Sequence, residues 1–221
     1  YEISTRDWSS DVCSSDLLGF ADAVLAGLAT DGGLYIPETW PAAPERIAAD
    51  YAKLATDVMS PYIGDEISQA DLAALCVSAY STFRDPRVTP LVPLEQGHWM
   101  LELFHGPTLA FKDVALQFLG RLFDHLLEAR DERITIVGAT SGDTGSAAID
   151  GVKNCSRVKI VILYPHGRVS DVQRRQMTTV NSPNVKTLAV DGTFDDCQDL
   201  VKAMFNHAEF RDRHQIGRAH V

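Results

Sequence analysis

The sequence is short of the features that would tie it to a membrane or to nucleic acid. No apolar run approaches the roughly 20 residues that a membrane-spanning helix needs, and no basic stretch followed by an apolar core opens the chain. Positive charge is scarce: 20 lysines and arginines stand against 30 aspartates and glutamates, for a formal charge of -10. This acidic balance argues against nucleic acid and anionic membranes as partners.

Cysteine is equally scarce. The four cysteines lie far apart, without the CxxC spacing of zinc and redox sites. We therefore expect no disulfide framework and no metal site, and the composition favours a reduced, cytoplasmic protein. The scattered histidines also lack a ligand pattern: His98, His125, His166, His207 and His214.

Two segments look like artefacts of sequencing. One set of codons for Asp11–Leu17 is GACGTGTGCTCTTCCGATCT plus one base, and its reverse complement, preceded by C, encodes Gln215–Val221. Chance rarely makes two parts of one chain encode each other's complementary strand, and both resemble a translated sequencing adapter. By the same resemblance the first segment begins near Asp7. We therefore predict that Asp7–Leu17 and Gln215–Val221 are artefactual, and that the chain is a fragment of a longer protein.

The first region, residues 1–85, carries mostly helical patterns. Apolar residues recur at helical spacing from Phe20 onward, and residues 48–59 and 69–83 are amphipathic. Three prolines then mark residues 85–94 as a linker. We take this linker as the boundary between two domains.

Strand and helix patterns alternate in the second region, residues 86–214. Strands are expected at 98–104, 133–138, 158–164 and 185–190, and helices at 112–129, 143–153, 170–180 and 194–210. The alternation predicts βαβ crossovers, and hence an α/β fold with a parallel sheet and helices on both faces. Ligands of such sheets bind beyond the carboxyl ends of the strands. Two informative loops, HGPTLAFK and ATSGDTG, fall there.

Lys112 is the most unusual residue of the first loop. It follows Leu109, Ala110 and Phe111, which offer no counter-charge, and it begins a predicted helix whose dipole opposes its charge. Its neighbour Asp113 fits an ordinary first-turn acid. One interpretation is a surface lysine at a loop–helix junction. The other is a lysine whose ammonium form is disfavoured, so that its neutral amine can act as a nucleophile.

The second loop, GATSGDTGS at residues 138–146, separates a predicted buried strand from a predicted helix. Small residues let backbone N–H groups approach a ligand, and hydroxyl groups add donors at a helix N-terminus, which suits an anion. The loop is neither a P-loop nor a GxGxxG fingerprint. A tight turn capped by Ser141, Asp143 or Thr144 is the structural alternative. Together, a nucleophilic lysine and an anion-binding loop suit an aldehyde cofactor held as a Schiff base.

The segments FHGPTLAFKD and ATSGDTGSAA, preceded by ISTR and DGGLYIPE, resemble the threonine synthase family. The resemblance covers nearly all of the chain outside the adapter-like segments. It implies the tryptophan-synthase-β fold type (PLP fold type II), here truncated, with pyridoxal 5'-phosphate bound as a Schiff base on Lys112. It also implies that O-phospho-L-homoserine and water are converted to L-threonine and phosphate.

The resemblance also assigns site residues by position. Lys112 is the catalytic residue, cofactor contacts fall to Lys112, Ser141, Gly142, Asp143 and Thr144, and substrate contacts to Thr140, Ser141, Thr144 and His105. Asp143 replaces the Asn of related enzymes, so we expect it to act through loop geometry. His105 is either a partner of substrate or cofactor, or a structural residue in a turn. The family's phosphate-binding loop and its partner for the pyridine nitrogen are missing, so we expect the 221 residues alone to be inactive.

Two alternatives stay open at this point. One is a serine/threonine dehydratase or another β-eliminating lyase of the same fold, against which ISTR and DGGLYIPE argue. The other is a non-catalytic threonine-synthase-like protein that binds phospho-ligands, against which Lys112 and the complete HGPTLAFKD loop argue. The sequence does not indicate an oligomeric state.

Overall fold

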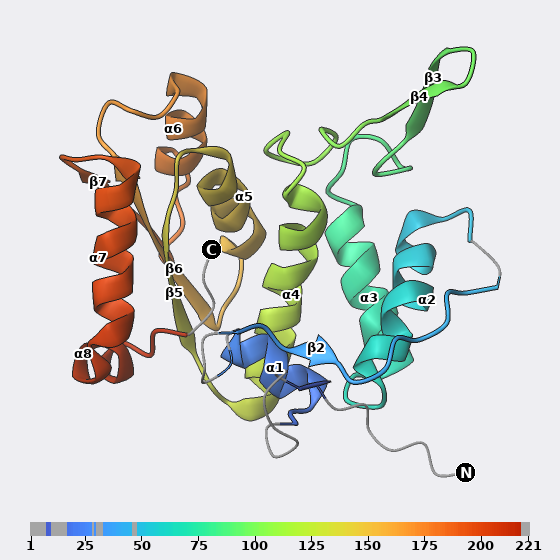
Figure 1. Cartoon of the computed structure of the whole chain (residues 1–221), viewed down its shortest axis with the longest axis horizontal. Helices are drawn as coiled ribbons and strands as arrows, with labels where there is room; N and C mark the ends of the chain where they lie inside the picture. Colours follow the sequence, from blue (N-terminus) through green and yellow to red (C-terminus); the bar gives the residue numbers. More distant parts are fainter. Residues whose placement is uncertain (1–7, 10–16, 28, 30–32, 46–47, 218–221) are drawn as a thin grey trace. The chain divides into compact units, whose positions relative to one another are not determined.

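The computed structural model describes residues 8–9, 17–27, 29, 33–45 and 48–217 (Figure 1). The chain divides into two compact units, and the division falls between Ser78 and Ala79. We predicted the boundary somewhat later, within residues 85–94.

The first unit is mostly helical, as its sequence patterns predict. It contains α1 (Phe20–Ala26), α2 (Tyr51–Ile63), most of α3 (Gln69–Tyr80), and the short antiparallel pair β1 (Trp8–Ser9) and β2 (Ile36–Pro37). Helix α2 begins at Asp50, whose carboxylate accepts the Lys53 N–H at 2.8 Å. The Glu66 carboxylate accepts the N–H groups of Phe20 and Ala21 at 2.5 and 2.9 Å. Side chains therefore satisfy some of the free N–H groups at each of these helix starts.

A three-stranded parallel sheet organises the second unit. Its strands are β5 (Ile134–Ala139), β6 (Val158–Pro165) and β7 (Val185–Val190), in that spatial order. The helices of this unit are α4 (Asp113–Arg130), α5 (Asp143–Val152), α6 (Asp171–Thr178), α7 (Phe194–Asn206) and α8 (Ala208–Arg213). Helices α5 and α7 lie on opposite faces of the sheet (Figure 1). The predicted α/β fold with a parallel sheet is confirmed.

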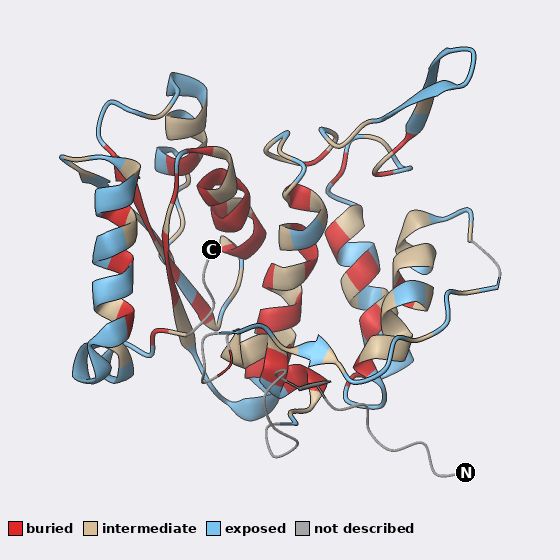
Figure 2. Ribbon diagram, viewed as in Figure 1, coloured by how far each residue is buried: buried red, intermediate tan, exposed pale blue. Residues whose placement is uncertain are grey.

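Burial explains why this sheet forms. Helix α5 is buried along most of its length (Figure 2). On the other face of the sheet, a hydrophobic cluster joins the strands to α7: Val137, Leu163, Cys197, Val201, Phe205 and Ile216. A parallel sheet needs apolar cover on both faces, and in this unit both faces have it.

The stretch at residues 91–101 corrects the sequence-based expectation. We predicted a linker over 85–94 and a strand of the alternating series at 98–104. Instead β3 (Leu91–Glu95) and β4 (His98–Leu101) form an antiparallel hairpin of their own. Pro93 obscured the first strand, because proline is rare in strands except at edges and bulges. The register shifts between Pro93 and Glu95, and Gly97 turns the chain at a φ of 80°.

The described part of the carboxyl-terminal adapter-like segment runs beside β5. The Thr135 N–H donates to the Gln215 carbonyl at 2.8 Å, and the Gly217 N–H donates to the Thr135 carbonyl at 3.1 Å. These are backbone bonds, which nearly any sequence can make, so they do not identify the origin of the segment. Of the other adapter-like segment, only Trp8, Ser9 and Leu17 are described. The adapter origin of both stays a prediction.

Helices α4 and α5 cross closely at two glycines. A Cβ at Gly120 would lie 2.1 Å from the Gly151 carbonyl oxygen, and a Cβ at Gly151 would lie 2.4 Å from the Leu116 carbonyl oxygen. Both obstacles are backbone atoms, which cannot rotate away. Glycine at these positions therefore sets the distance between the two helices.

We predict that Gly120→Ala destabilises the chain by about 1–3 kcal/mol, the usual range for an overpacked site. An unobstructed helical glycine would show the opposite sign, because alanine favours a helix by roughly 0.5–1 kcal/mol. Urea unfolding measures the change. Ala115→Gly, at an exposed position of the same helix, is the control for helix propensity alone. A Gly120→Ala variant as stable as the parent would contradict the close crossing.

Candidate functional site

The structure brings the two predicted loops together. Lys112 immediately precedes α4, and Asp143 is the first residue of α5, after the loop that leaves the carboxyl end of β5. The Lys112 Nζ donates to Asp143 Oδ2 at 3.1 Å and lies 4.3 Å from the centroid of the Phe111 ring. The Lys112 side chain is 27% exposed and that of Asp143 is 43% exposed. The amine is therefore held in place but is still accessible to a small molecule.

The Lys112–Asp143 contact corrects two expectations. We expected Lys112 to lack a counter-charge, and the Asp143 carboxylate supplies one. The hydrogen bond from Lys112 is also the main reason why the pKa of Asp143 is lowered. We also considered Ser141, Asp143 or Thr144 as helix caps, but the N-cap of α5 is Gly142, and no side chain caps the helix there. Local sequence could not show this contact, because the two residues are 31 positions apart.

Thr140 holds the SGDTG loop from inside. Its Oγ1 accepts the N–H groups of Gly142 at 3.0 Å and Gly145 at 2.9 Å. The Ser146 hydroxyl donates to the Gly142 carbonyl at 2.9 Å. Thr140 is 2% exposed, so its side chain offers little surface to a substrate. Ser141 is exposed and Thr144 is half-buried, which leaves both accessible to a ligand.

Gly142 is required by its conformation and by its surroundings. Its φ of 147° lies in the region that residues with a Cβ rarely adopt. A Cβ there would also lie 2.2 Å from Oε1 of Gln173. The predicted glycine of the loop thus allows the chain to turn sharply from β5 into α5.

Asp113 is a site residue that sequence reasoning missed. We interpreted it as an ordinary first-turn acid, yet it is completely buried. Its carboxylate accepts both the N–H and the hydroxyl of Thr108, each at 2.8 Å. A Cβ at Gly106 would lie 2.3 Å from the same carboxylate. Asp113 therefore folds the HGPTLAFK loop onto the start of α4, and the glycine and threonine upstream were the available signal.

His105 makes contacts with neighbouring protein groups. Its Nε2 lies 2.7 Å from Oε2 of Glu102, and its ring centroid lies 4.8 Å from that of Phe104. Its carbonyl accepts the Arg84 N–H at 2.9 Å. These contacts support the structural interpretation of His105 over contact with a ligand.

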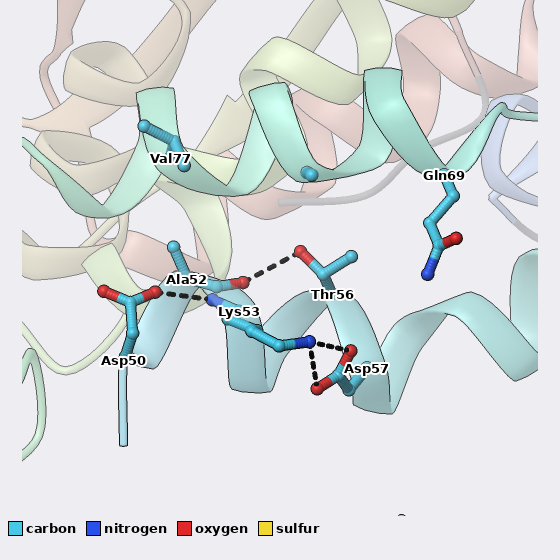
Figure 3. Close-up of a pocket in the computed structure, with 8 residues that line it drawn as sticks. Asp50, Ala52, Lys53, Thr56, Asp57, Gln69 and Val77 are labelled. Atoms are coloured by element: carbon cyan, nitrogen blue, oxygen red, sulfur yellow. Dashed lines mark hydrogen bonds and ion pairs between the residues drawn. The ribbon is translucent and has the colours of Figure 1, made fainter. Parts of the chain in front are cut away.

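A hollow of about 290 Å³ lies between α2 and α3 in the first unit (Figure 3). Two of its polar side chains pair with each other, since the Lys53 Nζ lies 3.0 Å from both carboxylate oxygens of Asp57. The Thr56 hydroxyl donates to the Ala52 carbonyl. None of the predicted site residues lines this hollow: its lining is Asp50, Ala52, Lys53, Thr56, Asp57, Gln69, Ala73 and Val77.

The described residues contain no group of three or more histidine, cysteine, aspartate or glutamate side chains placed to hold a metal ion. Among them, no helix is both long enough and apolar enough to cross a membrane.

Fold and candidate site together define the class as an α/β protein in which a partly exposed lysine meets the loop at the carboxyl end of a parallel strand. Comparison with known proteins shows which proteins the chain resembles. Residues 3–80 match the family described as "Threonine synthase N terminus". Over 193 residues the chain is 54% identical to the threonine synthase of Pseudomonas aeruginosa, covering 85% of this chain and 41% of that protein. It is 50% identical to the Saccharomyces cerevisiae threonine synthase, covering 92% of this chain and 43% of that protein.

Solved structures agree with this result. A PLP-bound threonine synthase from Brucella melitensis matches with a TM-score of 0.92 and 49% identity, over 98% of this chain and 47% of that chain. The yeast threonine synthase matches with a TM-score of 0.89 and 46% identity, over 96% and 45%. The chain is thus related to the threonine synthases and corresponds to an amino-terminal portion of them, as its motifs predicted. It spans less than half the length of these relatives.

We predict that Asp113→Asn changes how stability depends on pH. Burial raises the pKa of the Asp113 carboxyl above its ordinary value of 3.8. At pH values between the pKa of Asp113 in the unfolded chain and its raised pKa in the native chain, the native chain binds more protons than the unfolded chain. The contribution of Asp113 to stability therefore falls as pH rises. Urea unfolding at several values from about pH 4 to pH 7 should show the parent losing stability relative to the Asn variant. If the stability of the parent relative to the Asn variant instead increased with pH, the hydrogen bonds from Thr108 would lower the pKa of Asp113 by more than burial raises it.

We also predict that Asp143→Asn makes Lys112 more reactive. Both side chains are partly exposed, so the ion pair contributes less than about 1 kcal/mol and the variant should remain folded. Without its counter-charge, the Lys112 amine should react about threefold faster with acetic anhydride at neutral pH. Peptide mass spectrometry measures the rate, with exposed Lys159 as the internal control. An unchanged ratio of the two rates would show that the ion pair does not restrain the amine.

Proposed function

We propose that this chain is part of a threonine synthase, an enzyme that converts O-phospho-L-homoserine and water to L-threonine and phosphate. The observation that carries the proposal is the meeting of Lys112 with the SGDTG loop at the carboxyl edge of the sheet. Relatives named threonine synthase, at up to 54% identity, support it.

The residues present fit pyridoxal 5'-phosphate. Lys112 offers a partly exposed primary amine, the group that reacts with an aldehyde. The amine contacts Asp143 at the start of α5, and Ser141, Gly142 and Thr144 are the neighbours of Asp143 in the SGDTG loop. A solved relative holds PLP. When bound, this cofactor supplies an electron sink for the carbanions that form on an amino-acid substrate.

We propose the following roles for the site residues of the chain. Lys112 holds the cofactor and moves protons at the Cα and Cβ atoms of the substrate through its Nζ. The start of α5, with Ser141 and Thr144, binds the substrate carboxylate through N–H and hydroxyl donors. Asp143 orients the Lys112 amine through the ion pair, while Thr140 keeps the loop in shape. The substrate is a small molecule, and we place the protein in the cytoplasm.

The lysine site bears on the non-catalytic alternative. Lys112 is present with the complete HGPTLAFK loop, and its amine contacts Asp143 of the SGDTG loop. The intact site favours the enzyme.

A chimeric enzyme tests the proposal. Residues 18–214 would replace the matching segment of the Pseudomonas aeruginosa threonine synthase, and phosphate release from O-phospho-L-homoserine would be measured. We predict that the chimera is active and that Lys112→Ala lowers its rate by a factor of at least about 1,000, because the group that moves the protons is lost. Lys153→Ala, at the end of α5, is the matched control and should keep most of the activity. An active Lys112→Ala chimera would contradict the assignment.

A further inference from the structure

Helix α6 contacts both loops of the site, although it carries none of the predicted site residues. The Gln176 Nε2 donates to the Thr108 carbonyl at 2.9 Å, which joins α6 to the loop before Lys112. Gln173, one turn earlier, lies against Gly142 of the SGDTG loop. The helix therefore spans the two segments that bring Lys112 and Asp143 together.

On the lysine side, Gln176 completes the anchoring of Thr108. Asp113 already binds the N–H and the hydroxyl of Thr108, and Gln176 binds its remaining polar group, the carbonyl. The next residue, Leu109, has a φ of 68°, a conformation that a residue with a side chain adopts only when its surroundings impose it. The hydrogen bond from Gln176 thus acts on the segment that determines where Lys112 begins α4.

At the SGDTG loop, α6 packs against the start of α5. The Ser170 hydroxyl donates to Gln173 Oε1 at 2.8 Å, which holds that side chain over Gly142. Met177 is buried, and its sulfur would lie 3.0 Å from a Cβ at Gly145. The side chains of α6 therefore pack closely against two glycines of the SGDTG loop.

We propose that Gln176 is a positioning residue that ties the lysine loop to α6, and through α6 to the SGDTG loop. The hydrogen bond keeps the Lys112 amine within reach of the Asp143 carboxylate, 3.1 Å away. The importance of this contact for catalysis rests on the proposed function, whereas the contact itself does not. If the α4–α5 crossing alone set the geometry, removing the Gln176 amide would leave Lys112 unchanged.

Gln176→Leu tests the proposal in the 221-residue chain without cofactor, because leucine keeps similar bulk but cannot donate. We expect Lys112 to react about threefold faster with acetic anhydride relative to Lys159, as in Asp143→Asn. Arg175→Leu, at the exposed neighbouring position, is the matched control and should change neither rate. In the Asp143→Asn background, Gln176→Leu should add nothing, because the restraint is already lost. An unchanged Lys112 rate, or an equal effect in both backgrounds, overturns the proposal.

Hydrogen exchange gives a second readout that needs no turnover. Gln176→Leu should speed exchange of the Thr108 and Leu109 amides, which are bonded to Asp113 and to the Gly106 carbonyl. Should the Leu variant unfold, Gln176→Glu replaces it, because a carboxylate of the same shape cannot donate to the carbonyl. Unchanged exchange in a folded variant overturns the proposal, even if the chimeric enzyme is active. Faster exchange supports it, even if the chimera is inactive.

Discussion

The close crossing of α4 and α5 is the constraint on which the site depends. Gly120 and Gly151 let the two backbones approach, and the side chain of buried Gln117 crosses the gap to donate to Asp150 at 2.8 Å. Each helix begins with a residue of the site, so the crossing brings Lys112 and Asp143 into contact. A lysine that its neighbours leave without a counter-charge acquires one from the packing of two helices.

Much of the framework could be predicted from the sequence, because it rests on local patterns. The strands β5, β6 and β7 are short apolar runs bounded by turn residues, and the amphipathic helices between them required a parallel sheet. The SGDTG loop could be placed at the carboxyl edge of that sheet for the same reason. The position of Lys112 could not, because the strand before its loop, β4, belongs to a separate hairpin. The resemblance to a known family added what patterns cannot, a hypothesis about the chemistry.

Tertiary contacts could not be predicted in this way. The ion pair of Lys112 joins residues far apart in the sequence, and the complete burial of Asp113 depends on a loop folding over it. The Thr140 hydroxyl, which the resemblance assigns to substrate, accepts two N–H groups of its own loop. Pro93 concealed a strand, because its local preference argues against one while the hairpin tolerates it at a bulge. Only the ion pair joins residues far apart in the sequence. The hydrogen bonds of Thr140 and Asp113 span two to five positions, so the partners were nearby in the sequence but their geometry was not predictable.

The central claim is that Lys112 is the amine that receives an aldehyde cofactor. The most direct test is to incubate the 221-residue chain with pyridoxal 5'-phosphate, reduce it with borohydride, and locate the added mass by peptide mass spectrometry. We expect the label to accumulate first on Lys112, ahead of exposed lysines such as Lys159 and Lys186. Labelling spread evenly over the exposed lysines, with Lys112 unmodified, would contradict it.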